Sequence, residues 1–528
     1  MSTPVAPRAL WDDWLARRVG EIPAGCLRPA DLVTRLQALT AKHPARTRLE
    51  EIGRSVEGRP IHLLSVGSGA RRVLLWSQMH GDEPSATPAL LDLADYLLTE
   101  SAGGTVLDEL TLLMVPMLNP DGAERGVRRN AQGIDVNRDA LNLATPEGRI
   151  LKAVRDRYQP ILGFNLHDQD RRTTIGDTRR LATIALLAVA GDPAGTVTEG
   201  RMRARRACAA VVAALEPLIG PSIARYDEDW SPRAFGDNIT AWGTPVVLIE
   251  SGGLPPGQPL TDLTRLNFVA LVSVLSSLAA DDLAGHDPAL YERLTRNSTD
   301  AYADVVLRGG RIVQGPTPEP YRADIAYDVA APDARAWGCP GAADAGPSRI
   351  VEVGDARFIT AGREVDATGA LIVPALTVPV RGIAARRWLD AAALSDMARL
   401  GVARVRWHVR PADVGAALAI AREHAVPGRP TIEVVGATDA LSQPVVSRPP
   451  RRPKSLALFD VFSALSEWKF EMSFFKLPVP APLTAIELTR DAPASFLVLK
   501  PGPPAAPDDL VLEAVYIDGR ALPPPDLK

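Results

Sequence analysis

Short apolar runs alternate with longer segments of helical periodicity over about the first 285 residues. The runs predict strands and read IHLLSV (61–66), RRVLLW (71–76), TLLMVPML (111–118), ILGFNLH (161–167) and TPVVLIE (244–250). The segments between them that predict helices include ATPALLDLADYLL (86–98) and RARRACAAVVAALEPLI (203–219). Strands that are apolar on both faces and separated by helices are typical of a mixed, mostly parallel sheet flanked by helices. We therefore expect an α/β fold.

The pattern changes after about residue 300, where short β-like pieces are separated by turns rich in Gly and Pro. Three domains are expected. An α/β domain covers 1–300, and a smaller β-sandwich is formed by 301–380 together with 480–528. A short α/β insert and a Pro/Arg-rich linker cover 381–479.

Composition indicates an ordinary soluble protein, with 46% hydrophobic and 23% charged residues. The net charge of −4 gives no reason to expect nucleic acid or a membrane as a partner. The first residues lack the apolar core of a secretory signal, and the longest apolar run, LATIALLAVAG, is too short to span a bilayer. The three cysteines, Cys26, Cys208 and Cys339, are scattered and predict neither a disulfide framework nor a thiolate metal site. A cytoplasmic location is expected, and formation of a homo-oligomer is left open.

Polar residues follow several of the strand-like runs. His80, Asn119, His167 and Glu250 all fall within a few residues of the end of such a run. Binding residues in folds of this class collect beyond the carboxyl ends of the strands. We expect these side chains to lie near one another.

Zinc hydrolysis requires three protein ligands, typically two His and one carboxylate, with an open position for water. His80 and Glu83 lie three residues apart, with Gly81 available for a sharp turn and Pro84 for the first turn of a helix. His167 supplies a third candidate ligand at the end of another strand. The other five histidines have no acidic partner at ligand spacing and are expected to be structural or exposed. A lone HxxE pair is common, so these residues by themselves leave a metal site and a satisfied buried histidine both open.

Residues from about 28 to 285 resemble the zinc carboxypeptidase family. The motifs that carry the resemblance occur in the family's order: IGRSVEGRPIHLLSVG, MHGDE, NPDG, DVNR, NLH and VLIESGG. The resemblance implies one Zn²⁺ ion held by His80, Glu83 and His167. It also implies that Asp135 fixes the orientation of a ligand imidazole and that Glu250 is the catalytic general base.

The same resemblance assigns residues to the substrate. Arg128 matches the arginine that stabilises the oxyanion, although Arg129 is its neighbour. Asn137 and Arg138 match the pair that binds the terminal carboxylate of the substrate.

The sequence departs from the family at three places, which are Asp82 before Glu83, Asn165 two residues before the last ligand, and Asp168-Gln169 after it. Tyr226 is the nearest match to the mobile tyrosine of the family. The segment from Tyr226 to Asp237 carries Arg233 and several acidic residues, so it is expected to contact a charged part of the substrate.

Two parts of the second half resemble the β-sandwich strands of the amidohydrolase superfamily, namely 304–378 and 492–522. The HxH motif that should follow the strands of the first part is absent, and His408 and His424 are the only histidines of the region. We expect a sandwich whose barrel is largely lost, retained for packing, dimerisation or covering of the cleft.

The sequence thus predicts a zinc-dependent hydrolase that cleaves a peptide or small amide bond next to a free carboxylate. Two alternatives remain. One is a deacylase of N-acyl amino acids with the same fold and metal. The motif HGDEP also resembles that of such deacylases. The other is a non-catalytic binding protein. The preferred side chain of the substrate is left open.

Overall fold

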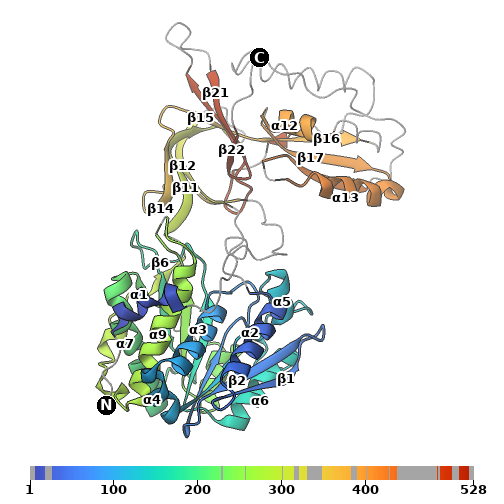
Figure 1. The fold of residues 1–528 in the computed structure, drawn as a ribbon. Helices are drawn as coiled ribbons and strands as arrows, with labels where there is room; N and C mark the ends of the chain where they lie inside the picture. The colour runs from blue at the N-terminus through green and yellow to red at the C-terminus, as the bar shows by residue number, and fades with distance from the viewer. Residues whose placement is uncertain are drawn as a thin grey trace. The chain divides into compact units, whose positions relative to one another are not determined.

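The chain divides into two compact units, one running to Ala301 and the other beginning at Tyr302 (Figure 1). In this computed structural model the described residues are 6–17, 27–226, 230–255, 257–299, 301–313, 320–329, 348–381, 389–399, 401–426, 428–436, 484–485, 488–501 and 510–522. Cys26, Cys339 and the Pro/Arg-rich linker lie outside them.

The first unit is built on an eight-stranded mixed sheet with the order β1-β2-β4-β3-β5-β9-β7-β8. Its strands are β1 (Thr47–Arg54), β2 (Pro60–Val66), β3 (Arg71–Trp76), β4 (Leu110–Val115), β5 (Leu162–Asp168), β7 (Ile184–Ala188), β8 (Ile223–Arg225) and β9 (Val246–Ser251). The four central strands, β4, β3, β5 and β9, run parallel to one another. The antiparallel pairs join β1 to β2, β2 to β4 and β7 to β9. The expected mixed, mostly parallel sheet is confirmed.

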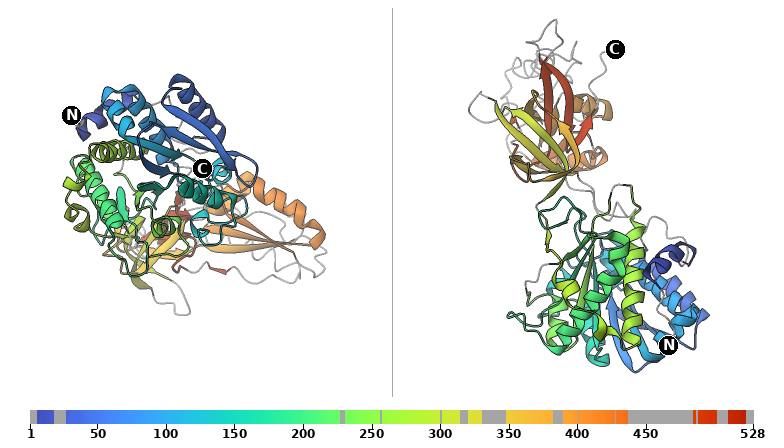
Figure 2. Two further views of the ribbon diagram at one scale, coloured as in Figure 1. Left: turned by 90° about the horizontal axis from the view of Figure 1, so that it is seen from below. Right: turned by 90° about the vertical axis from the view of Figure 1, so that its left-hand side faces the viewer.

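Helices lie on both sides of this sheet (Figure 2). They are α1 (Pro7–Arg17), α2 (Pro29–Lys42), α3 (Ala86–Thr99), α4 (Ser101–Glu109), α5 (Pro120–Arg125), α6 (Pro146–Tyr158), α7 (Glu199–Ile219), α8 (Phe235–Ala241), α9 (Thr261–Ala279) and α10 (Ala289–Glu292). Short 3₁₀ turns occur at η2 (Val136–Arg138) and η3 (Leu283–Gly285). The hydrophobic core of one face contains residues of α1, α2, α3, α4, α7 and α9, and that of the other face contains residues of α6 and α8.

The central strands alternate between these two cores. In β3, Val73 and Leu75 pack in the core with α3 and α9, whereas Leu74 and Trp76 pack in the core with α6 and α8. Because both faces are covered, the strand reads as an unbroken apolar run rather than an alternating one.

One helix of the described chain, α9, is long and apolar enough to cross a membrane. Of its most apolar 18-residue window, 78% is buried inside the protein. Phe268 and Leu271 of α9 belong to the core beneath the sheet. This burial is typical of a helix in the core of a folded domain.

The second unit contains two sheets. The larger has eight strands, which are β11 (Tyr302–Ile312), β12 (Tyr321–Asp328), β13 (Arg349–Gly354), β14 (Thr360–Asp366), β15 (Leu371–Pro374), β20 (Phe496–Pro501), β21 (Leu510–Ile517) and β22 (Arg520–Leu522). Strands of both expected parts of the β-sandwich, 301–380 and 480–528, occur in it, because β15 pairs with β20 and joins the two groups in one hydrogen-bonded sheet.

The smaller sheet of this unit matches the expected α/β insert in character. Its strands are β16 (Leu376–Arg381), β17 (Val402–Val409), β18 (Thr431–Gly436) and β19 (Thr484–Ala485). The parallel strands β16, β17 and β18 are connected through α12 (Ala391–Arg399) and α13 (Val414–Glu423). The insert begins at β16, a few residues earlier than the sequence indicated.

Candidate metal centre and active site

Two neighbouring strands of the first unit direct polar residues to the same face of the sheet. In the parallel pair of β5 and β9, His167 lies opposite Glu250, and Asn165 lies opposite Leu248. Residues directly opposite in such a pair share a face. All four line one cavity of about 740 Å³, at the carboxyl ends of the strands as expected.

The loop after β3 carries two further residues of the cavity, His80 and Glu83. The expected sharp turn is present, because Gly81 and Asp82 form a turn closed by a hydrogen bond from the N–H of Glu83 to the carbonyl of His80 at 3.3 Å, without a left-handed backbone at Gly81. A glycine is needed at position 81 because a Cβ atom there would lie 2.0 Å from the carbonyl carbon of Gly122. The HGDE loop and the NPDG segment, which forms the start of α5, therefore pack backbone against backbone.

Gln78 holds the start of this loop. It has a left-handed φ of 43°, which is uncommon for a residue other than Gly. Its side-chain amide donates to the carbonyl of Gly81 at 3.1 Å and accepts from the hydroxyl of Thr87 at 2.7 Å. These two bonds tie the loop to the first turn of α3.

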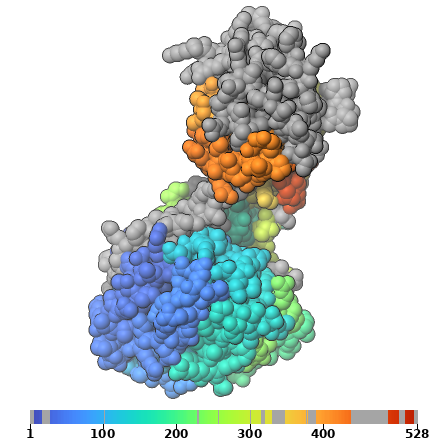
Figure 3. All heavy atoms as spheres, turned by 90° about the vertical axis from the view of Figure 1, so that its right-hand side faces the viewer, coloured from blue at the N-terminus to red at the C-terminus, as the bar shows by residue number. Residues whose placement is uncertain are grey.

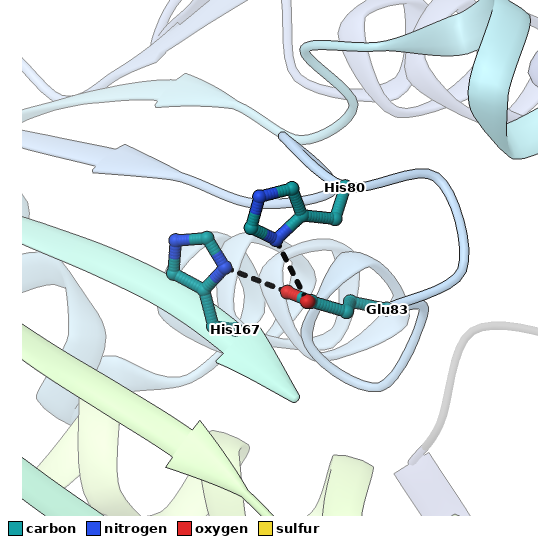
Figure 4. A group of neighbouring side chains, drawn as sticks. All are labelled: His80, Glu83 and His167. Atoms are coloured by element: carbon teal, nitrogen blue, oxygen red, sulfur yellow. Dashed lines mark hydrogen bonds and ion pairs between the residues drawn. The ribbon is translucent and has the colours of Figure 1, made fainter. Parts of the chain in front are cut away.

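The structure brings His80, Glu83 and His167 together in a buried group (Figure 4). Glu83 Oε1 lies 2.7 Å from His80 Nδ1, and Glu83 Oε2 lies 2.6 Å from His167 Nδ1. One ligand atom from each residue lies within 4.8 Å of the other two. Two imidazole nitrogens and a carboxylate are a typical donor set for a catalytic zinc ion.

Asp135 orients the first of these ligands. Its Oδ1 lies 3.0 Å from Nε2 of His80 and also accepts the backbone N–H of Asn137 at 2.9 Å. A proton on Nε2 of His80 leaves Nδ1, the nitrogen that faces Glu83, as the lone-pair donor. Arg128 Nη1, which can only donate, lies 3.1 Å from the same Nδ1. Both contacts favour the tautomer that a metal ligand needs.

The charges of the group interact strongly with one another. Burial lowers the pKa of His167, whereas in His80 the charge of Glu83 and the bond to Asp135 outweigh burial and raise the pKa to about 9. The two histidines hold the pKa of Glu83 below its usual range in spite of its burial. Nε2 of His167 is buried without a hydrogen-bond partner in the described chain. The residues present could hold one zinc ion.

Of the two adjacent arginines, Arg128 is the one in the cavity. Its Nη1 donates to Glu83 Oε1 at 3.0 Å, and its Nε donates to Asp135 Oδ2 at 3.1 Å. Arg129 instead donates to the carbonyl of Gly133 at 3.0 Å.

Glu250 is 8% exposed at the end of β9. Its burial and the negative charges of Glu83 and Asp168 raise its pKa well above the usual range for a carboxyl group. A divalent cation at the neighbouring ligands would oppose this repulsion. Glu250 therefore lies where a carboxylate could exchange a proton with a group bound at the metal ligands.

The remaining predicted substrate residues separate into two groups. Asn137, Arg138 and Tyr226 line the cavity. The pKa of the Tyr226 phenol is raised by Glu250 and by burial, so the phenol remains protonated at neutral pH. Arg233 is exposed and is not among the residues that line the cavity, which removes the basis for its proposed contact with the substrate. Residues 227–229 lie outside the described chain.

One wall of the cavity was not predicted from the sequence. A two-residue strand, β10 (Asn297–Ser298), follows α10 and pairs with β6 (Thr174–Ile175). Residues 296–299 all line the cavity. A strand this short leaves no periodic signal in a sequence, and only its polar composition sets it apart.

The wall formed by residues 296–299 accounts for one of the departures from the family, which is Asp168-Gln169 after the last ligand. Gln169, two residues after His167, accepts a hydrogen bond from Asn297 Nδ2 at 3.0 Å and donates to the carbonyl of Ala182 at 2.9 Å. Asp168 accepts the N–H of Ser85 at 3.1 Å and also its hydroxyl. The pair thus connects the end of β5 to the β10 wall and to the start of α3.

Residues 32–158 match the model of the zinc carboxypeptidase family. The resemblance predicted from the motifs is confirmed for this part of the chain. The matched range includes His80, Glu83, Arg128 and Asp135 and ends before β5, so His167 and Glu250 join the site through the fold.

Curated relatives include several carboxypeptidases. Carboxypeptidase SOL1 of Arabidopsis thaliana is 28% identical over 157 residues, which cover 26% of this chain and 32% of the relative. Carboxypeptidase E of Caenorhabditis elegans is 31% identical over 167 residues, covering 27% of this chain and 35% of the relative. The chain thus spans about a third of the length of these relatives. Among solved structures, a metallo-carboxypeptidase from Burkholderia cenocepacia is 19% identical with a TM-score of 0.41, over 48% of this chain and 70% of its own.

Proposed function

We propose that the first unit is a zinc-dependent hydrolase that cleaves a peptide or amide bond next to a free carboxylate. The observation that carries the proposal is the convergence of His80, Glu83 and His167 in a cavity that also contains Glu250 and Arg138. The family match and the carboxypeptidase relatives support it.

A zinc ion bound by these ligands would polarise the scissile carbonyl and lower the pKa of water to near 7. Glu250 takes the proton from the attacking water and delivers it to the leaving nitrogen. Its position opposite His167 places the carboxylate beside the ligands, and its burial excludes bulk water from the proton transfer.

Arg128 stabilises the negative charge that develops on the carbonyl oxygen. Its bonds to Glu83 and Asp135 fix the guanidinium before the substrate arrives. A donor that is oriented in advance of the reaction is worth on the order of 10²–10³ in rate.

Asn137 and Arg138 bind the carboxylate of the substrate. Asn137 is oriented by its side-chain oxygen, which accepts the backbone N–H of Phe235 at 2.8 Å. This bond leaves the amide nitrogen of Asn137 as the group that donates to a ligand. Arg138 is exposed at the cavity and offers the bidentate geometry that suits a carboxylate.

Replacement of Glu250 by Gln tests the mechanism. We expect Glu250→Gln to retain zinc and to lose at least 10²-fold in kcat on peptides with a free carboxyl terminus, because the general base is removed. Glu199→Gln, at an exposed position on α7, is the control and keeps full activity. Full hydrolysis by zinc-loaded Glu250→Gln would overturn the mechanism.

A comparison of substrates decides between the remaining functions. Peptides with a free carboxyl terminus, the same peptides amidated at that terminus, and N-acyl amino acids are assayed in parallel. We expect cleavage of the first group alone. Preference for N-acyl amino acids would identify a deacylase, and binding of zinc and peptide without cleavage of any substrate would identify a binding protein.

A further inference from the structure

A second, smaller cavity of about 190 Å³ adjoins the metal ligands. It shares Glu83, Arg128 and residues 168–170 with the main cavity, whereas Asn137 and Arg138 line the main cavity alone. The side chains that belong only to the smaller cavity include Asp82, Leu260 and Leu263. The smaller cavity therefore reaches the ligands without reaching the proposed carboxylate site.

Most charged groups around this cavity already have partners. Asp168 accepts both hydrogen bonds that Ser85 offers. Asp170 forms an ion pair with Arg172 at 3.5 Å. Arg128 is bonded to Glu83 and Asp135. Arg171 is the remaining cation of the lining, and it is not among the charges that act most strongly on Asp82.

Asp82 is different. Its Oδ1 is buried and has no hydrogen-bond partner in the described chain. The charges that act most strongly on it are those of Glu83, His80 and Arg128, of which the last two are already engaged with Glu83 and Asp135. A buried carboxylate oxygen without a partner is unfavourable unless an incoming group supplies a donor.

We propose that Asp82 is a specificity-determining residue that selects a cationic group on the amino side of the scissile bond. The group is the ammonium of a free amino terminus, and the aliphatic carbons of the terminal residue contact Leu260 and Leu263. The proposal rests on the proposed function, because it takes the carboxylate end of the substrate to lie at Arg138 and the scissile bond at Glu83. It favours short peptides with a free amine over neutral N-acyl amino acids.

The test compares two tripeptides of identical sequence, one with a free amino terminus and one acetylated. Wild-type protein is expected to have a kcat/KM at least tenfold higher on the free peptide. Asp82→Asn, which keeps the shape of the side chain, is expected to lose about tenfold on the free peptide and to leave the acetylated peptide unchanged. Zinc content, measured on every variant, separates an effect on substrate from an effect on the neighbouring ligand Glu83.

Two further variants complete the design. Asp31→Asn, at an exposed position of α2, is the assay control. Asp170→Asn removes a negative charge whose partner is Arg172, and it is expected to keep the preference for the free peptide. Equal losses in Asp82→Asn on both peptides, or loss of the preference in Asp170→Asn instead, would overturn the role of Asp82. If wild-type protein cleaves both peptides equally well, the role of Asp82 is overturned and the proposed function is not. If it cleaves neither peptide, the proposed function is overturned.

Discussion

Asp135 contacts three parts of the site at once. One oxygen faces Nε2 of His80 and the backbone of Asn137, and the other accepts Nε of Arg128. Its pKa lies below the usual range because its contacts with His80, followed by the charge of Arg128, outweigh its burial. The carboxylate therefore aligns three residues of the proposed site, which are His80, Asn137 and Arg128.

We expect Asp135→Asn to weaken zinc binding by about 10–100-fold, because the amide keeps the shape of the contact and loses its charge. A competition titration with a metal indicator measures the dissociation constant. Asp156→Asn, in an exposed ion pair on α6, is the matched control. An unchanged dissociation constant in Asp135→Asn would contradict the orienting role.

Asp237 lines the cavity in a partly buried position at the start of α8. Its burial raises its pKa to about 6, against the bond that it accepts from the N–H of Ser231 at 2.8 Å. A raised pKa means that the folded protein binds the proton more tightly than the unfolded chain. Stability from this group is therefore lost as the pH rises from about 4 through 6.

We expect Asp237→Asn to raise the free energy of unfolding by about 1–2 kcal/mol at pH 7.5, because Asn can accept the same N–H without a buried charge. The gain should shrink as the pH is lowered toward 4. Urea unfolding at both pH values measures it. A gain that is equal at the two pH values would show that the charge of Asp237 is not its cause.

The contact between Gly81 and Gly122 connects two segments that are far apart in the sequence. Each segment follows a strand of the parallel centre, β3 or β4, and these strands are hydrogen-bonded neighbours. The two segments approach so closely that a Cβ atom at Gly81 would collide with the backbone of Gly122 and Ala123. The position of the HGDE ligands therefore depends on the NPDG segment.

We expect Gly81→Ala to lower the free energy of unfolding by about 1–3 kcal/mol and to weaken zinc binding, because the added methyl would push the two segments apart. Gly104→Ala is the matched control, since a Cβ there meets nothing within 4 Å and Ala favours the helix α4. Thermal unfolding and the zinc titration are measured on both variants. If the two variants behave alike, the packing argument is wrong.

Unbroken apolar runs of six or seven residues were predictable as strands from the sequence, whereas the two-residue strand β10 was not. The runs at 71–76 and 161–167 became β3 and β5 because each is apolar on both faces of a covered sheet. Strand ends that meet at one edge of a parallel sheet predicted that the polar residues would lie close together, but His80, Glu83 and His167 were assigned as a ligand set only through the resemblance to the zinc carboxypeptidase family. β10 escaped detection, since two residues held by a hydrogen bond from Asn297 to Gln169 create no pattern along the chain.

The molecule as a whole consists of two units, and all residues of the proposed site belong to the first. The segments coloured from blue to cyan in Figure 3 form one surface of that unit. The second unit has its own cores, in which Trp407 and Phe496 are fully buried. The resemblance of this unit to amidohydrolase strands stays a prediction, because a pattern of short apolar runs and turns indicates β structure without specifying which strands pair.

A fragment that ends at Ala301 tests the independence of the first unit. We expect it to bind zinc and to hydrolyse peptides with a kcat/KM within a few-fold of the full chain, because it retains both cores and the β10 wall. Asn297→Ala in the same fragment removes the bond to Gln169 and should raise KM more than it lowers kcat. A folded Ala301 fragment that binds zinc and lacks activity would show that the second unit contributes to the site.

The central claim is that His80, Glu83 and His167 hold one zinc ion that hydrolysis requires. Metal analysis of the purified protein, performed together with a peptidase assay before and after chelation, tests it most directly. We predict one zinc ion per chain, loss of activity on chelation, recovery on addition of zinc, and neither zinc nor activity in folded His167→Ala. Undiminished hydrolysis by the fully chelated protein, or a full zinc complement in His167→Ala, would contradict the claim.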